Sequence, residues 1–393
     1  MCLFSFFMSD LLSDLFSAYY EARKNKRATL NALSFEVEYE KNIMELYQEI
    51  LDRRYAIRPS VCFVVTHPVK REIFAADFRD RIVHHLIYYY INPLFEKHFI
   101  FDSYSCRKGK GTSFGVRRVN HFLRACSNNY QKNCWILKLD IEGYFMSMDR
   151  SILWDIIYSV FSRKRNMYFD TDSILYLLHS VIFNDPTKNC IVKGDKKDWI
   201  GLPQNKSLFF TQEGKGFPIG NLTSQLFGNV YLDGFDHFVR ENLGVRWYGR
   251  YVDDMVFVDD RKEFLLEIFP KISHYLSQNL GLKIHPKKIY LQPLFNGVTF
   301  LGFRIKPYRI YVGSRIKRNF SICAKRIGEI YKEKNVLNAE EKYKMLSSIN
   351  SYLGCMYRCK SYSLRKKIID SLMDSGLQNH FYPDDEILKI TKR

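Results

Sequence analysis

The sequence predicts an α+β fold that combines short antiparallel strands with helices. Residues 250–257 place β-branched and aromatic residues on both sides of Asp253 and Asp254, a pattern typical of two strands joined by a tight turn. Residues 135–145 form a nearly continuous apolar run, long enough for a buried strand. From residue 313 onward, apolar residues recur at helical spacing.

Three carboxylates accompany these strands. A tight turn lets Asp253 and Asp254 project together, where they repel each other unless a cation intervenes. Asp140 lies near the end of the apolar run, and a buried unpaired aspartate is costly. If the two regions are adjacent, the three carboxylates can hold two Mg²⁺ ions for in-line phosphoryl transfer. Simpler interpretations are a solvated Asp-Asp turn and Asp140 as the N-cap of the next helix.

These motifs resemble those of the reverse transcriptases, with Asp140 in the family's third motif and residues 251–254 in its fifth. The resemblance covers about residues 59–312, and the motifs come in the family's order. It implies an RNA-directed DNA polymerase with a right-hand fold. In that fold, fingers precede a palm of antiparallel strands flanked by helices, and a helical thumb follows.

The resemblance divides the chain into three domains. They are an N-terminal helical and basic extension over residues 1–58, the fingers and palm over 59–312, and the thumb over 313–393. A length of 393 residues suits two or three domains, and 46% hydrophobic residues are sufficient for a sizeable core. Little chain follows the thumb, so we expect no separate nuclease domain.

Composition limits the partners and the compartment. The net charge of +18 indicates an acidic polymer, because Lys and Arg that neutralise phosphates release counterions. Nucleic acid fits this charge better than a membrane, and solubility alone is the alternative. The nine cysteines include no Cys-x-x-Cys pair, so neither a disulfide framework nor a zinc ribbon is indicated. We therefore expect a reducing cytoplasm. The family resemblance implies a bacterial or phage-encoded protein.

Helices are predicted at four places in the first third of the chain: after Ser9, over residues 43–51, over residues 80–93 with Pro93 as the end, and from Thr112. His84 and His85 are adjacent on a helix and cannot share a metal, so packing or solvation is expected. The basic stretch 23–27 is either a solvated face or a contact for template or structured RNA.

Residues 61–65 and 71–75 predict two strands joined by a turn that carries Pro68 and Lys70. In the family, a basic residue on the returning strand contacts the incoming triphosphate. The resemblance gives this role to Arg71, with Lys70 as its neighbour. A guanidinium suits phosphate because its donors form a planar fork. The alternative is an exposed strand arginine without a ligand.

Residues 103–112 place glycines between cations, which lets the backbone approach a phosphate chain closely. This stretch resembles the family's second motif and lacks the Gly-Lys-Ser/Thr ending of a Walker A loop. The resemblance implies contact with the template backbone for three residues: Arg107, Lys108 and Lys110.

Phe145 lies five residues after Asp140, where the family places the aromatic residue beneath the incoming sugar. A ring there would clash with a 2′-hydroxyl group and so favour deoxynucleotides. The alternative for Phe145 is core filling. The resemblance also implies the backbone of Ile141 as an additional metal contact.

The fourth motif departs from the common pattern. Ile219-Gly220 and Ser224-Gln225 stand where intron-encoded and retroviral members generally carry Gln-Gly and Ser-Pro. This version resembles the reverse transcriptases of diversity-generating retroelements, which misincorporate mainly opposite template adenines. It implies nucleotide contacts for Ile219, Gly220 and Gln225. Because the Ile219 side chain cannot form a hydrogen bond, fidelity should be low, and ordinary core packing is the alternative.

Two further segments border the acidic hairpin. Residues 192–216 are polar and are expected to loop out. After the hairpin, residues 264–280 predict a helix ended by Gly281. The family's sixth motif implies a lysine near the triphosphate, and Lys288 is the match, with a solvated lysine as the alternative. Residues 300–303 resemble the seventh motif.

Apolar stripes predict three helices in the C-terminal part of the chain. A basic face recurs every seven residues on the first helix, at Arg318, Lys325 and Lys332. The family implies that this thumb lies against the product duplex and contacts its phosphates. A solvated charged face is the alternative.

The sequence is therefore identified as a member of the reverse transcriptases, of the diversity-generating type. The implied partners are template RNA, the RNA/cDNA duplex, deoxynucleoside triphosphates and a basic accessory protein, with no membrane. The implied cofactor is a pair of Mg²⁺ ions. Alternatives are an intron-type or retron-type enzyme, or an inactive RNA-binding relative.

Overall fold

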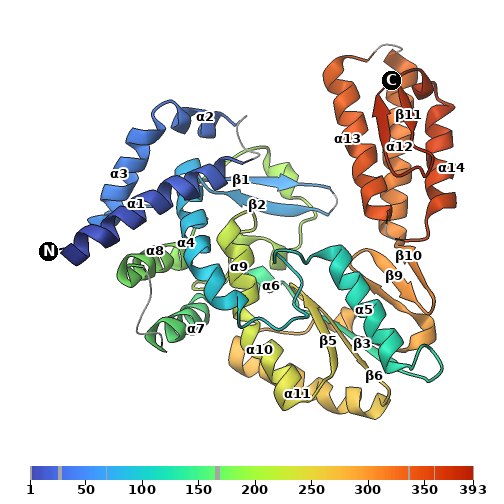
Figure 1. Cartoon of the computed structure of the whole chain (residues 1–393), viewed down its shortest axis with the longest axis horizontal. Coiled ribbons are helices and arrows are strands. Elements are labelled where there is room, and N and C mark those ends of the chain that lie inside the picture. The colour runs from blue at the N-terminus through green and yellow to red at the C-terminus, as the bar shows by residue number, and fades with distance from the viewer. Residues whose placement is uncertain are drawn as a thin grey trace.

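A four-stranded antiparallel sheet lies at the centre of the computed structural model of this chain (Figure 1). Its strands, in the order β5-β6-β3-β7, are β5 (Trp247–Tyr251), β6 (Asp254–Asp259), β3 (Trp135–Asp140) and β7 (Tyr290–Pro293). β5 and β6 form the hairpin expected around the acidic turn, and β3 is the expected apolar strand. The predicted α+β combination is therefore confirmed.

The structure describes residues 2–24, 29–67, 69–163, 169–334, 337–357 and 359–392. Two predicted features lie partly outside these residues. They are the basic stretch, at Asn25, Lys26 and Arg27, and the fingers turn, at Pro68.

Both faces of the central sheet are buried. On β6, Met255 and Phe257 belong to one hydrophobic core, whereas Val256 and Val258 belong to another. Because side chains alternate along a strand, these cores lie on opposite faces of the sheet. Helix α11 (Lys262–Leu280) covers the first face, and α5 (Thr112–Cys126) covers the second. Cover on both faces explains the continuous apolar sequence of the strands.

Three N-terminal helices share the first core with the sheet and with α4 (Phe78–Glu96). They are α1 (Cys2–Arg23), α2 (Leu30–Glu36) and α3 (Tyr39–Leu51). Two expected limits are wrong. α1 begins at Cys2, because the apolar residues before Ser9 continue the helix. α4 runs through Pro93, which lies one turn from the helix end and removes only one backbone hydrogen bond there. The domain limit at residue 58 stays a prediction.

The second sheet has the order β2-β1-β4 and consists of β1 (Ser60–Val65), β2 (Arg71–Ala75) and β4 (Cys190–Val192). β1 and β2 form the expected hairpin, and β4 pairs parallel with β1. Residues 192–216 are mostly exposed, as expected, but the segment stays in contact with the fold. The segment continues beside the hairpin through 3₁₀ turns η1 (Lys196–Trp199), η2 (Gln204–Lys206) and η3 (Leu208–Phe210). The buried Leu208 packs against Cys62 and Phe74, an apolar anchor hidden in a polar stretch.

Further helices and a third sheet complete this part of the chain. The helices are α6 (Tyr144–Ser147), α7 (Arg150–Arg163), α8 (Thr171–Phe183), α9 (Leu222–Tyr231) and α10 (Asp233–His237). The third sheet has the order β10-β9-β8, with β8 (Val298–Phe300), β9 (Phe303–Lys306) and β10 (Arg309–Val312). α9 packs against both α4 and α7, and its first turn contains Ser224 and Gln225 of the fourth sequence motif.

The three expected C-terminal helices are present as α12 (Ser314–Lys334), α13 (Ala339–Met356) and α14 (Tyr362–Met373). They enclose a hydrophobic core of their own, in which Phe320, Leu353 and Leu372 are buried. A hairpin of β11 (Phe381–Pro383) and β12 (Ile390–Lys392), which the sequence did not predict, joins this core. Figure 1 shows the helices in orange to red, beyond β9 and β10. Among the described residues, no helix combines the length and apolar character that a membrane crossing needs.

Candidate active site

The three predicted aspartates meet at one end of the central sheet. Asp140 is the last residue of β3, and Asp254 is the first residue of β6, directly opposite it in the antiparallel register. Val252 and Asp253 form the turn before Asp254, and the Asp253 carbonyl accepts a hydrogen bond from the backbone N–H of Ile141 at 3.3 Å. The N-cap alternative for Asp140 is excluded, because Gly143 occupies the N-cap position of α6.

The turn contains backbone strain. Val252 has a φ of 55°, a left-handed conformation that a β-branched residue rarely adopts. The guanidinium of Arg250 donates to the Val252 carbonyl at 3.1 Å, which supports this conformation. Arg250 therefore helps to fix the turn that carries Asp253 and Asp254.

Arg250 belongs to a fully buried ion pair. Its guanidinium donates to both carboxylate oxygens of Asp236 on α10 at 2.6–3.0 Å, and both side chains are 0% exposed. The hydroxyl of Tyr248 donates to the same carboxylate at 2.7 Å. Sequence reasoning missed this pair. The only available signal was a charged residue beside an apolar strand, and nothing in the sequence singled out Asp236.

Burial governs the charge of the acidic turn. It raises the pKa of Asp253 to about 6, and the nearby Asp140 carboxylate raises this pKa further. Burial also raises the pKa of Asp254 to about 6, against the opposing effect of Lys138. Both shifts disfavour the ionised carboxylate. The site therefore holds negative charge that the protein compensates only in part.

Two lysines face the carboxylates. Lys288 donates to Oδ1 of Asp140 at 2.7 Å. The Lys138 ammonium lies 3.0 Å from Oδ1 of Asp254, an ion contact without hydrogen-bond geometry, so this buried oxygen has no hydrogen bond. Lys288 was assigned to the incoming triphosphate, whereas Lys138 was not singled out by the sequence.

The donor set suits a divalent cation in its chemistry, because hard cations prefer carboxylate oxygens. The buried Oδ1 of Asp254 without a hydrogen bond points the same way. In the described residues, however, no group of three or more Asp, Glu, His or Cys side chains is arranged to hold a metal as it stands. Lys138 and Lys288 each lie within 3.0 Å of a carboxylate oxygen, so a metal ion at either oxygen would compete with a lysine.

The fourth motif lies between the fingers hairpin and α6. The Ile219 carbonyl accepts from the backbone N–H of Phe74 on β2 at 2.9 Å. Gly220 has a φ of 129°, and a Cβ there would lie 2.9 Å from the Phe74 carbonyl oxygen. The side chains of Ile219 and Phe145 are partly buried in the same small apolar cluster. This packing gives both side chains a structural role. Because they are only partly buried, both can also contact a nucleotide.

Three other residues were predicted to contact the nucleotide: Lys70, Arg71 and Gln225. Arg71 begins β2 with an exposed side chain, and its positive charge opposes the rise in the pKa of Asp253, so it lies on the carboxylate side. Lys70 donates to the Ile200 carbonyl at 2.8 Å. The side chain of Gln225 accepts from the Cys106 thiol at 3.3 Å, which connects the fourth motif with the second.

The second motif divides into structural and accessible cations. The guanidinium of Arg107 pairs with Glu96 at 2.9 Å and donates to two backbone carbonyls, with only 5% of the side chain exposed. This placement favours a structural role for Arg107 over the implied template contact. Lys110 lies over the Phe101 ring, and burial lowers its pKa to about 8. Lys108 is exposed.

The three basic residues expected on the thumb all lie on α12 and are exposed. Lys325 also lies 3.8 Å from Glu329, a surface contact that contributes little. Arg318, Lys325 and Lys332 are thus accessible to a polyanion.

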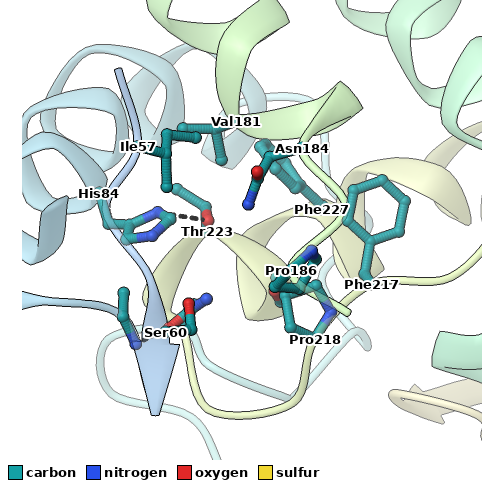
Figure 2. Close-up of a pocket in the computed structure, with 13 residues that line it drawn as sticks. Ile57, Ser60, His84, Val181, Asn184, Pro186, Phe217, Pro218, Thr223 and Phe227 are labelled. Carbon is teal, nitrogen blue, oxygen red and sulfur yellow. Dashed lines mark hydrogen bonds between the residues drawn. The ribbon is translucent and has the colours of Figure 1, made fainter. Parts of the chain in front are cut away.

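Behind the fourth motif lies a small cavity, shown in Figure 2. The figure shows His84 and Thr223 facing each other across a hydrogen bond, whose Nδ1–Oγ1 distance is 2.8 Å. Burial lowers the pKa of His84 to about 3, so the ring is neutral, as expected for a packing histidine. The cavity volume of about 20 Å³ suits one water molecule and is far too small for a nucleotide.

Comparison with known proteins gives a family match over most of the region that contains the motifs. A family model described as "Reverse transcriptase (RNA-dependent DNA polymerase)" matches residues 70–305. Protein YkfC of Escherichia coli (strain K12) is 22% identical over 294 residues, which cover 66% of this chain and 70% of that protein. Nuclear intron maturase 4, mitochondrial, of Arabidopsis thaliana is 23% identical over 220 residues, covering 56% of this chain and 23% of the maturase.

Among solved structures, the chain is similar to two yeast telomerases. For apo telomerase from Candida tropicalis, truncated from its C-terminal domain, the TM-score is 0.47 at 14% identity, covering 65% of this chain and 55% of that one. For telomerase from Candida albicans with a fragment of telomeric RNA, the TM-score is 0.48 at 11% identity, covering 85% and 64%. The chain thus spans less than two thirds of these telomerase chains.

Proposed function

The chain belongs to the reverse transcriptase family, and from this premise we propose that it copies a template RNA into cDNA at the site formed by Asp140, Asp253 and Asp254. The observation that carries the proposal is the register that sets Asp140 opposite Asp254, within the residues that match the family. The fold is the family's right-hand polymerase fold, with the β1–β2 hairpin in the fingers, the central sheet as the palm and α12–α14 as the thumb.

The proposed chemistry assigns one task to each group. Two Mg²⁺ ions, when bound by the three carboxylates and the Ile141 backbone, would activate the primer 3′-hydroxyl and stabilise the leaving pyrophosphate. Lys288 leaves Asp140 and neutralises the triphosphate together with Arg71. Phe145 lies beneath the sugar and disfavours a 2′-hydroxyl group.

The more specific proposal is a diversity-generating type with low fidelity at template adenines. It is supported by the isoleucine at position 219 and the glutamine at position 225, in place of the glutamine and proline of other members. The similarity to the Arabidopsis intron maturase favours a second candidate, an intron-type enzyme. Copying accuracy separates these two candidates.

Primer extension on an RNA template tests the activity. We expect the purified chain to extend a DNA primer with deoxynucleotides and Mg²⁺, and the double variant Asp253→Ala/Asp254→Ala to be inactive while still binding RNA. RNA binding without extension by the wild type would indicate the inactive relative instead. We also propose a basic accessory protein as a partner. Efficient synthesis by the monomeric chain without additions would contradict that partner.

Ile219→Gln is expected to raise copying accuracy opposite template adenines several-fold. A glutamine side chain can restore a hydrogen bond near the nascent base pair, and such a contact contributes about 1–3 kcal/mol of discrimination. Deep sequencing of cDNA from both proteins measures the change. Ile219→Leu keeps an apolar side chain and serves as the matched control. Equal adenine error rates in all three proteins would leave Ile219 as a packing residue.

A further inference from the structure

The strand that carries Arg71 is held from its opposite side. Successive side chains on a strand point to opposite faces, so Arg71 and its neighbour Glu72 diverge. Arg71 is exposed, and its charge acts on the Asp253 carboxylate, whereas the Glu72 side chain is buried, with the residue only 1% exposed. What surrounds Glu72 therefore determines where this end of β2 lies.

Within the part of the chain that the structure describes, the hydrogen-bond donors to the Glu72 carboxylate come from one segment, residues 196–208. The indole Nε1 of Trp199 donates to Oε2 at 2.6 Å, and the hydroxyl of Ser207 donates to the same oxygen at 2.7 Å. The backbone N–H of Leu208 donates to Oε1 at 2.6 Å. Short hydrogen bonds to a buried carboxylate are stronger than neutral ones, so three of them fix the strand firmly to the segment.

The same segment also contacts the palm. The side-chain amide of Asn205 donates to Oε1 of Glu142 at 3.2 Å, two residues beyond Asp140. Gly143 has a φ of 54°, and a Cβ at this glycine would lie only 2.8 Å from the Asn205 carbonyl oxygen. At the fingers end, the Ile200 carbonyl accepts from Lys70. Residues 196–208 thus bridge the strand of Arg71 and the loop after Asp140.

We infer that residues 196–208 form a clamp that sets the position of Arg71 relative to the three aspartates, with Glu72 as the positioning residue through which the clamp acts. This inference rests on the proposed function, in which Arg71 contacts the incoming triphosphate. Loosening the clamp should weaken nucleotide binding more than the chemical step. RNA binding should not change, because the other basic surfaces are unaffected.

Glu72→Gln tests the clamp with nearly unchanged side-chain shape. In glutamine an NH₂ group replaces one of the two carboxylate oxygens, and this group cannot accept a hydrogen bond. At least one of the three hydrogen bonds to residue 72 is therefore lost. We expect the KM for the incoming nucleotide to rise about ten-fold, with kcat within about three-fold of the wild type and unchanged RNA affinity. Glu213→Gln is the matched control, since its side chain is 91% exposed and lies 3.5 Å from Lys188. It should change neither constant.

A double-mutant cycle separates the clamp from general loss of stability. Trp199→Phe removes one donor to Glu72, so the KM effects of Trp199→Phe and Glu72→Gln should be clearly less than additive. Additive effects would overturn the clamp. If Glu72→Gln does not fold, Trp199→Phe and Ser207→Ala each remove a single donor and should raise KM several-fold.

Hydrogen exchange provides a readout that does not need activity. Glu72→Gln should increase amide exchange in β2 and in residues 196–208 but not in β3 and β6. An active Glu72→Gln with unchanged KM, or unchanged exchange at these amides, would overturn the clamp. A wild-type protein without extension activity would overturn the proposed function instead, and the exchange result would still decide whether residues 196–208 hold β2.

Discussion

Asp253→Asn is expected to lower primer extension about 10³-fold while making the metal-free protein more stable at neutral pH. The loss follows from removing one of the carboxylates proposed to hold the metal ions. The gain in stability follows from the raised pKa. Folding moves the pKa of Asp253 from 3.8 to about 6, so the folded protein binds a proton that the unfolded chain releases between these values.

The raised pKa of Asp253 determines how its contribution to the free energy of unfolding changes with pH. For this carboxyl group, the free energy of unfolding falls as pH rises from about 4 to about 6, and the cost persists above that range. Two pKa units correspond to about 3 kcal/mol, and because the residue as a whole is only half-buried we expect about 1–2 kcal/mol. The stabilisation of Asp253→Asn should be present above pH 6 and absent below pH 4.

Urea unfolding at pH 4 and pH 7.5 without metal measures this difference. Asp260→Asn is the control, because its side chain is 62% exposed and lies just beyond the same hairpin. It should leave both stability and extension unchanged. Added Mg²⁺ should stabilise the wild type more than Asp253→Asn, since a ligand stabilises the state that binds it. A variant less stable than the wild type at pH 7.5 would show that Asp253 contributes to folding.

Asp236→Ala is expected to lower the free energy of unfolding by about 3–5 kcal/mol, the largest stability effect in the palm. The cause is Arg250, which would remain fully buried with its charge unpaired. Extension should fall as well, because Arg250 also holds the Val252 carbonyl in the strained turn. Urea unfolding, with the midpoint and slope compared between variants, measures the change.

A second variant tests the physical cause. Asp236→Leu combined with Arg250→Met replaces both ions with apolar side chains, so it should recover a large part of the lost stability. Extension should stay low, because the Val252 carbonyl still lacks its donor. If the double variant were no more stable than Asp236→Ala, loss of packing rather than an unpaired charge would explain the result.

Local patterns in the sequence predicted the strands, the acidic hairpin and the thumb helices, because alternation and helical spacing reflect burial directly. Proximity of Asp140 to the hairpin followed from the resemblance, and the register confirms it. The partners of buried charges could not be predicted. Asp236 lies on a different element from Arg250, and the donors to Glu72 lie more than a hundred residues away.

Two other misses have physical reasons. Residues 192–216 are polar on average, which gave no sign of the buried Leu208 or of the hydrogen-bond donors to Glu72. The sequence therefore did not show that this segment packs against the rest of the chain. Lys288 was assigned to the triphosphate, and Lys138 was not singled out. In the structure both lysines pair with carboxylates, which depends on three-dimensional proximity alone.

The hydrophobic cores determine which parts of the structure a core substitution can disturb. The N-terminal helices and the catalytic strands are packed into one continuous interior, whereas α12–α14 enclose another. A substitution of a core residue in α1 or α3 can therefore disturb the strands that carry the three aspartates, although it lies outside the matched family region. A substitution in the core of α12–α14 acts first on a different set of side chains.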